Sequence, residues 1–164
     1  MALLKSVCTE GCCKLITWHA DYAPRSWPSG VTAKAGVILT DEKQRLLVVQ
    51  SRNSKWGFPK GTVEPYESLT QCASRELLEE TTIFIPVGIL ETKPVIQLHY
   101  QTLFIVKNYP APKINVDSLK ATTPHNDVSG IGWVDPTCFA RHRNPPVAMT
   151  KALSDYITLM STTK

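Results

Sequence analysis

Residues 61–83 read GTVEPYESLTQCASRELLEETTI, and three of their glutamates have a spacing that folding alone does not require. Glu76, Glu79 and Glu80 stand at positions i, i+3 and i+4, which places three carboxylates on one helix face within a single turn. Like charges four residues apart destabilise a helix by about 0.3 kcal/mol per pair. A divalent cation would reverse that penalty, because Mg²⁺ and Mn²⁺ prefer oxygen ligands. For this spacing alone, the alternative is an acidic helix face exposed to solvent.

The residues around these glutamates complete a longer pattern. Gly61 lies six positions before Glu67, and Arg75 follows Glu67 by eight positions. The stretch resembles the Nudix box, G-x5-E-x7-R-E-U-x-E-E-x-G-U, in which U is a bulky aliphatic residue. Every position matches except the second glycine, where Thr82 stands. A β-branched residue is disfavoured in the left-handed conformation of a terminal glycine, so we expect the helix to end differently here.

The resemblance implies one Nudix domain over residues 1–164, an α/β/α sandwich with a mixed central sheet. It also implies a hydrolase that splits a phosphoanhydride bond of a nucleoside diphosphate linked to another group, using water activated by Mg²⁺ or Mn²⁺. By the same resemblance, Glu76, Glu79, Glu80 and the Gly61 carbonyl are metal ligands, and the three glutamates are catalytic. Arg75 is expected to pair with Glu67 and to orient the loop without taking part in the chemistry.

Residues 54–61, SKWGFPKG, resemble more narrowly the catalytic Nudix domain of mRNA-decapping enzymes. That likeness implies a capped-RNA substrate and release of m⁷GDP. Lys60, Lys34 and Trp56 are the candidate substrate-binding residues, although a tryptophan in such a turn more often packs. Two alternatives stay open. One is a pyrophosphatase for dinucleoside polyphosphates, diphosphoinositol polyphosphates or nucleotide sugars, and the other is a catalytically inactive Nudix-like nucleotide-binding module.

A general base is expected outside the box. Residues 126–133, NDVSGIGW, resemble a segment of decapping enzymes in which an acidic residue precedes a strand that ends in an aromatic residue. Asp127 occupies the acidic position and is a candidate base or metal ligand. His125 is the alternative base, because the ordinary pKa of histidine is close to neutral.

The composition is that of a soluble globular domain, with 43% hydrophobic and 20% charged residues. No apolar run in the sequence is long enough for a membrane span, so no membrane partner is expected. The odd number of cysteines, five, argues against a complete disulfide framework and predicts a reducing compartment, the cytoplasm. The net charge of +4 and a basic loop at residues 141–143 suit a polyanionic, nucleotide-type substrate. The sequence does not indicate an oligomeric state.

Composition and periodicity predict the remaining elements. We expect an irregular arm at residues 1–30 and a helix that begins near Ser68. A long, substrate-facing loop is expected at residues 107–126 and a C-terminal helix at residues 147–160. Strands are predicted at residues 31–39, 46–50, 83–90, 97–106 and 127–134.

Overall fold

The computed structural model describes residues 3–7, 13–18, 33–51, 55–110, 128–141 and 148–162. Its strands form one sheet in the order β1-β2-β9-β4-β3-β8-β7, with β5 paired to β4 and β6 paired to β3. The sheet is mixed, because β3 and β8 run parallel while the other pairs are antiparallel. The strands are β1 (Leu3–Val7), β2 (Lys14–Trp18), β3 (Lys34–Asp41), β4 (Leu46–Ser51), β5 (Trp56–Gly57), β6 (Lys60–Thr62), β7 (Val95–Leu98), β8 (Gln101–Tyr109) and β9 (Val128–Val134).

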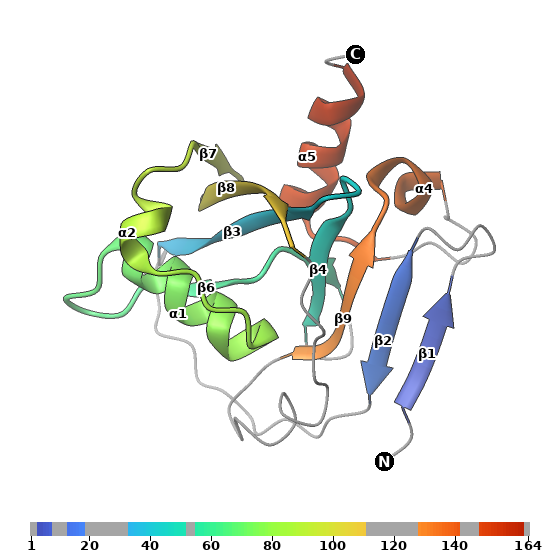
Figure 1. The fold of residues 1–164 in the computed structure, drawn as a ribbon, viewed down its shortest axis with the longest axis horizontal. Coiled ribbons are helices and arrows are strands. Elements are labelled where there is room, and N and C mark those ends of the chain that lie inside the picture. Colours follow the sequence, from blue (N-terminus) through green and yellow to red (C-terminus); the bar gives the residue numbers. More distant parts are fainter. Residues whose placement is uncertain are drawn as a thin grey trace.

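Helices lie on both faces of this sheet (Figure 1). The longer ones, α1 and α5, pack against opposite faces through two separate hydrophobic clusters. The arrangement confirms the predicted α/β/α sandwich with a mixed sheet. The described helices are α1 (Leu69–Thr81), α2 (Val87–Leu90), α4 (Pro136–Arg141) and α5 (Lys151–Thr162). No helix within the described ranges is long and apolar enough to cross a membrane.

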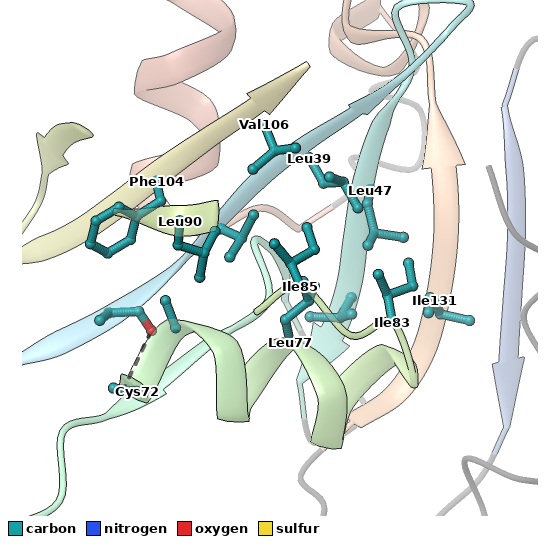
Figure 2. Packing of buried hydrophobic residues seen from close by; sticks show 14 of the residues in the cluster. Leu39, Leu47, Cys72, Leu77, Ile83, Ile85, Leu90, Phe104, Val106 and Ile131 are labelled. Atoms are coloured by element: carbon teal, nitrogen blue, oxygen red, sulfur yellow. Dashed lines mark hydrogen bonds between the residues drawn. The ribbon is translucent and has the colours of Figure 1, made fainter. Parts of the chain in front are cut away.

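Each central strand divides its side chains between the two clusters. In β3, Val37 and Leu39 belong to the cluster against α1, whereas Ile38 belongs to the cluster against α5. This alternation follows from the two-residue repeat of a strand, and the middle of β3, residues 35–39, has no polar side chain because both of its faces are covered. Figure 2 shows the α1 side, where Leu77 of the helix lies among side chains from the sheet.

The segment that carries the sequence motif lies where β3 and β4 diverge. These two strands pair at Thr40 and Leu46, and β6 then pairs with the first half of β3. In that ladder Gly36 lies opposite Lys60, Ala35 lies opposite Gly61, and Lys34 lies opposite Thr62. The register therefore places Gly61 in the sheet directly beneath α1.

The structure does not contain two of the predicted strands, those at residues 83–90 and 97–106, as single strands. Residues 83–90 are not a strand, because Pro86 precedes a short helix and its carbonyl accepts the amides of Ile89 and Leu90. The segment 97–106 is not one strand. It contains a tight turn at His99 and Tyr100, which separates β7 from β8.

Other boundaries also differ from the predictions. The residues 107–109 continue β8, so the predicted loop begins later, and residues 111–127 lie outside the described ranges. Helix α5 begins at Lys151 instead of residue 147, which itself is not described. The stretch 1–30 is not irregular throughout, because it contains β1 and β2, which pair with each other and join the sheet through β9. The predicted strands 31–39, 46–50 and 127–134 correspond to β3, β4 and β9.

Candidate functional site

Helix α1 begins where the sequence predicts, because Ser68 caps it. The Ser68 hydroxyl accepts the Gln71 amide at 3.1 Å, and the Gln71 side chain accepts the Ser68 amide at 2.8 Å. These reciprocal bonds form a capping box, which satisfies amide groups that a helix start leaves without partners. The cap fixes the start of the helix, and with it the direction in which the glutamates project.

Arg75 is the centre of the charged cluster on α1. Its guanidinium binds Glu67 through two bonds, from Nε at 2.7 Å and from Nη2 at 2.9 Å. Nη1 also donates to Glu76 at 2.9 Å and to Glu79 at 3.3 Å, and it lies 3.8 Å from a Glu64 oxygen. The expected pair of Arg75 and Glu67 is therefore present, within a larger group in which four carboxylates surround one cation.

The pKa values within this cluster shift in opposite directions. The hydrogen bond from Arg75 lowers the pKa of Glu67. Burial raises the pKa of Glu76, and the nearby charge of Glu79 raises it further, against the opposing effect of Arg75. The hydrogen bond with Glu67 also raises the pKa of Arg75, which remains protonated. The cluster thus has more negative charge than one guanidinium can balance.

Gly61 has no room for a side chain because the Glu76 carboxylate occupies that space. A Cβ built on Gly61 would lie 2.1 Å from the Glu76 carboxylate carbon. On the same side, the thiol of Cys72 donates to the Gly61 carbonyl oxygen at 3.5 Å. Burial raises the pKa of this thiol to about 12, so it stays a neutral donor. Sequence reasoning missed Cys72, although its position one turn before Glu76 on the same helix face was available as a signal.

Glu80 contacts the start of β6. Its side chain is 9% exposed, and one of its oxygens accepts the backbone amide of Lys60 at 2.9 Å. Glu79 is more exposed and binds Arg75. The two neighbours diverge because successive residues are rotated by about 100° around a helix axis. The bond from Lys60 to Glu80 ties the end of α1 to the start of β6.

Helix α1 ends at Thr82 in the left-handed conformation, with φ at 65°, so the expectation of a different ending is wrong. The preceding residue helps: the Thr81 hydroxyl donates to the Leu77 carbonyl at 2.6 Å and accepts the Ile83 amide at 3.1 Å. A non-glycine residue in this conformation costs about 1–2 kcal/mol. Thr82 therefore ends the helix in the backbone conformation that a glycine would adopt, despite this cost.

The donor chemistry at this site fits a hard divalent cation. Carboxylates from neighbouring helical turns and a strand carbonyl are oxygen ligands, and the excess negative charge around Arg75 is a reason for a cation to bind. In the described residues, no three histidine, cysteine, aspartate or glutamate side chains are gathered as a metal-binding group. Glu76 and Glu79 bind Arg75, and Glu80 binds the Lys60 amide. Metal ligation by these glutamates therefore stays a prediction.

The remaining predicted residues lie in several places. Lys34 is half-buried at the start of β3, opposite Thr62. Trp56 is 5% exposed and packs in the cluster against α5, which favours packing over a substrate-facing role. Asp127, His125 and most of the basic loop at 141–143 lie outside the described residues. The described cysteines, Cys13, Cys72 and Cys138, are buried and form no disulfide bond.

Comparison with known proteins gives a consistent set of relatives. Residues 31–152 match the NUDIX domain. A protein of Invertebrate iridescent virus 3 named "Putative hydrolase 111R" is 36% identical over 140 residues, which cover 80% of this chain and 77% of that protein. The "Putative 8-oxo-dGTP diphosphatase" of Bacillus subtilis strain 168 is 30% identical, with 64% of this chain and 67% of that protein covered. The mRNA-decapping enzyme subunit 2 of Arabidopsis thaliana is 28% identical, with 66% and 29% covered.

Solved structures agree with this fold. A bifunctional NMN adenylyltransferase/ADP ribose pyrophosphatase from Francisella tularensis, complexed with AMP and a manganese ion, has a TM-score of 0.53 at 19% identity and covers 80% of this chain and 41% of its own. The MutT protein of Methanosarcina mazei Go1 has a TM-score of 0.52 at 19% identity and covers 80% and 93%. At this level of identity, the likeness supports the shared fold.

Proposed function

Because this chain belongs to the Nudix family, we propose that it hydrolyses a phosphoanhydride bond of the mRNA cap and releases m⁷GDP. Its class follows from the family: it is a pyrophosphohydrolase, a hydrolase acting on acid anhydrides. One observation carries the proposal, namely the carboxylate cluster of α1 placed against Gly61 of β6. That arrangement brings together acidic side chains and a strand carbonyl, which suits the splitting of a polyphosphate.

Each residue of the cluster has a role in this proposal. Glu76, Glu79, Glu80 and the Gly61 carbonyl would hold Mg²⁺ or Mn²⁺, which when bound supplies an activated water and neutralises phosphate charge. Arg75 holds Glu76 and Glu79 in position through its bonds to both carboxylates. Lys60 is the proposed phosphate contact, and its backbone amide bonds to Glu80. Asp127 is the proposed base.

Capped RNA is the proposed substrate for two reasons. The segment 54–61 resembles decapping enzymes, and the relatives include the decapping subunit of Arabidopsis thaliana. The net charge of +4 also favours a polyanion, even though α1 concentrates several acidic groups. Binding of RNA through phosphate contacts would weaken as the salt concentration rises.

A second candidate is a pyrophosphatase for small nucleotides. It is favoured by the similarity to the Bacillus subtilis protein named as an 8-oxo-dGTP diphosphatase, which is matched over most of its length. Dinucleoside polyphosphates, diphosphoinositol polyphosphates and nucleotide sugars belong to the same group of alternatives. A catalytically inactive nucleotide-binding module is the third alternative, and the presence of all three helix glutamates argues against it.

The test compares three substrates with Mg²⁺ or Mn²⁺ present: cap-labelled RNA, a diadenosine polyphosphate and ADP-ribose. The key variant carries Glu79→Gln and Glu80→Gln. Glutamine at residue 80 keeps an oxygen that can accept the Lys60 amide, so the fold should persist. The matched control is Glu91→Gln, because Glu91 is an exposed glutamate next to α2.

We expect the wild type and the Glu91→Gln control to release m⁷GDP from RNA, and the double variant to lose at least about 100-fold in rate, as expected when charge-stabilising groups are removed. Turnover of the small molecules alone would overturn the decapping proposal and support the second candidate. Binding of a nucleotide without turnover of any substrate would support the inactive module.

A further inference from the structure

Gln101, the first residue of β8, has a buried polar atom without a partner. Its side chain belongs to a residue that is 6% exposed, and within the described part of the chain no donor reaches its Oε1 atom. A buried amide oxygen that loses its bond to water without gaining another is costly, and such groups are rare in folded proteins. A hydrogen-bond donor on a bound ligand would remove this cost by pairing with the Gln101 oxygen.

The sheet register places Gln101 in the last row of side chains at one end of the sheet. This row contains Thr62 of β6, Lys34 of β3, Gln101 and Leu98 of β7, which are paired across neighbouring strands. Since paired residues on adjacent strands point to the same face, their side chains share one face of the sheet. Leu98 packs in the cluster against α5, so this is the α5 face.

The row begins at a residue that contacts the carboxylate cluster. The carbonyl oxygen of Thr62 accepts a bond from Arg75 at 3.2 Å. Gln101 lies two strands away from Thr62, which corresponds to about 10 Å between their backbones. Because β3 and β8 begin at this row and β6 ends there, the carboxylate cluster on the α1 side and Gln101 on the α5 side both lie near the same end of the sheet. A nucleotide has the length to join the two places.

The hairpin holds Gln101 in a fixed position. Gln101 and Leu98 close the turn between β7 and β8, and the two residues of that turn, His99 and Tyr100, have φ values of 48° and 65°. Positive φ at both central positions gives the tight turn that matches the twist of paired strands, but it is normally made by asparagine and glycine. The strained backbone of His99 and Tyr100 therefore lies directly before Gln101 in the chain.

We propose that Gln101 is a specificity-determining residue, whose amide oxygen accepts a hydrogen bond from an N–H group of the substrate's nucleobase. The inference rests on the proposed function, in which that base is the guanine of the cap. Lys34, paired with Gln101 on the same face, places a cation beside this subsite, which suits a base that is attached to phosphates. A site that hydrogen-bonds a base in a buried place discriminates against analogues that lack the donor.

The test compares four proteins: the wild type, Gln101→Met, Gln101→Glu and Thr40→Val. Methionine keeps the length of the side chain but removes the amide, and glutamate keeps an oxygen acceptor. Thr40 is the matched control, since its Oγ1 is also buried without a partner within the described residues but lies at the far end of β3. Removing an unpaired buried acceptor does not destabilise the fold, so thermal unfolding of Gln101→Met should be at or above the wild-type temperature.

The substrates are RNA with an N7-methylated guanosine cap, here called guanosine-capped RNA, and RNA with the N7-methylated cap of either of two analogues. Inosine lacks the 2-amino donor group of guanine, and 2-aminopurine riboside lacks its N1–H donor. We expect kcat/KM of the wild type to fall about tenfold on at least one analogue, mostly through KM. Gln101→Met should lose this preference, because its kcat/KM should fall about tenfold on guanosine-capped RNA and stay unchanged on the analogue. Gln101→Glu and Thr40→Val should keep the preference.

Equal rates of the wild type on all three caps, or a preference that survives in Gln101→Met, would overturn the inference and leave Gln101 a structural residue. A wild type that hydrolyses no capped RNA would instead overturn the proposed function. In that case calorimetry with GDP, IDP and the diphosphate of 2-aminopurine riboside decides the role of Gln101 separately. Tighter binding of GDP by the wild type but not by Gln101→Met would support the base contact, and equal binding would overturn it.

Discussion

The two faces of the ladder between β3 and β6 are both built around a glycine, but for different reasons. On the α1 face, Gly61 makes space for the Glu76 carboxylate, the end of a side chain. On the α5 face, Gly36 makes space for the Pro59 carbonyl oxygen, which would lie 2.2 Å from an added Cβ, and for Lys60 Cβ at 2.6 Å. A side chain can rotate away, but a backbone cannot without moving the strand.

The difference separates the framework from the site. The Pro59 carbonyl that crowds Gly36 also accepts the Val37 amide at 3.1 Å, so it belongs to the bonding of the sheet. The carboxylate that crowds Gly61 belongs to the charged cluster. Substitution of Gly36 should therefore affect stability first, and substitution of Gly61 should affect activity at a smaller cost in stability.

The largest effect is expected for Gly36→Ala. The new methyl group would force the β3–β6 backbones apart, and overpacking of this kind lowers the free energy of unfolding by about 3 kcal/mol. Urea denaturation measures the change. Gly88→Ala is the control, because within the described structure nothing lies within 4 Å of a Cβ at Gly88, and alanine favours helix α2. A Gly36→Ala protein as stable as Gly88→Ala would contradict the rigid-backbone explanation.

Arg75→Met should be the next most damaging change. It leaves Glu67 and Glu76, both largely shielded from solvent, without their shared cation, at a cost of about 2 kcal/mol in unfolding free energy. The loss should be smaller at pH 4 than at pH 7, because protonated carboxyl groups no longer repel one another. Chemical denaturation at both pH values measures it. An identical loss at the two values would show that packing of the arginine, and not its charge, is what matters.

Gly61→Ala should cost about 1.5 kcal/mol in stability, since the Glu76 side chain can move aside. That movement displaces a carboxylate of the proposed site, so the rate of m⁷GDP release should fall by at least about tenfold. Parallel measurements of unfolding and turnover in Gly61→Ala and Gly36→Ala test the comparison directly. Activity retained in folded Gly61→Ala would argue that the position of Glu76 is not critical.

Two glutamates that share Arg75 should respond to pH with opposite signs. The pKa of Glu67 is lowered, so its contribution is present above its unfolded pKa of about 4.3 and is lost as the pH falls through the folded value. Glu67→Gln should thus cost about 1 kcal/mol at pH 7, and the cost should vanish in acid. The pKa of Glu76 is raised, so Glu76→Gln should be at least as stable as the wild type at pH 7. The unfolding free energies of the wild type, Glu67→Gln and Glu76→Gln, measured from pH 7 to pH 3, test this prediction. A loss of stability in both variants at pH 7 would contradict it.

The smallest expected effect is a gain in stability, for Thr82→Gly. Thr82→Gly relieves the left-handed strain at the end of α1, worth about 1–2 kcal/mol, but glycine gives back about 1 kcal/mol through the greater freedom of the unfolded chain. A net increase of about 0.5 kcal/mol in unfolding free energy is expected, and thermal denaturation would detect it. Thr81→Gly is the contrasting variant, because it removes the hydroxyl that bonds Leu77 and Ile83, and it should destabilise.

The sequence predicted best where a local signal and the tertiary structure agree. Ser68 and Gln71 form a capping box that can be read from the chain, and α1 begins there. The strands β3 and β4 were predicted from their central runs, residues 35–39 and 46–49, which have no polar side chains because both of their faces are buried. The motif also indicated the bond between Arg75 and Glu67, which joins residues from the loop and the helix.

The misses arise where composition and geometry conflict. Residues 83–90 are rich in β-branched side chains, yet Pro86 has its φ set for a helix start, and a short helix follows it. The turn at His99 and Tyr100 has neither glycine nor asparagine, so nothing in the sequence marked it. The orphaned oxygen of Gln101 depends on long-range burial, which local patterns do not encode.

Thr82 has a consequence for how relatives of this protein are recognised. A search pattern that insists on glycine after the paired glutamates rejects this chain, even though its backbone there adopts the glycine-like geometry. The neighbouring hydroxyl of Thr81 holds the chain as it leaves the helix, through its bonds to Leu77 and Ile83, so this ending does not depend on a glycine. Genomic surveys that accept a threonine pair at this place should recover members that stricter filters discard.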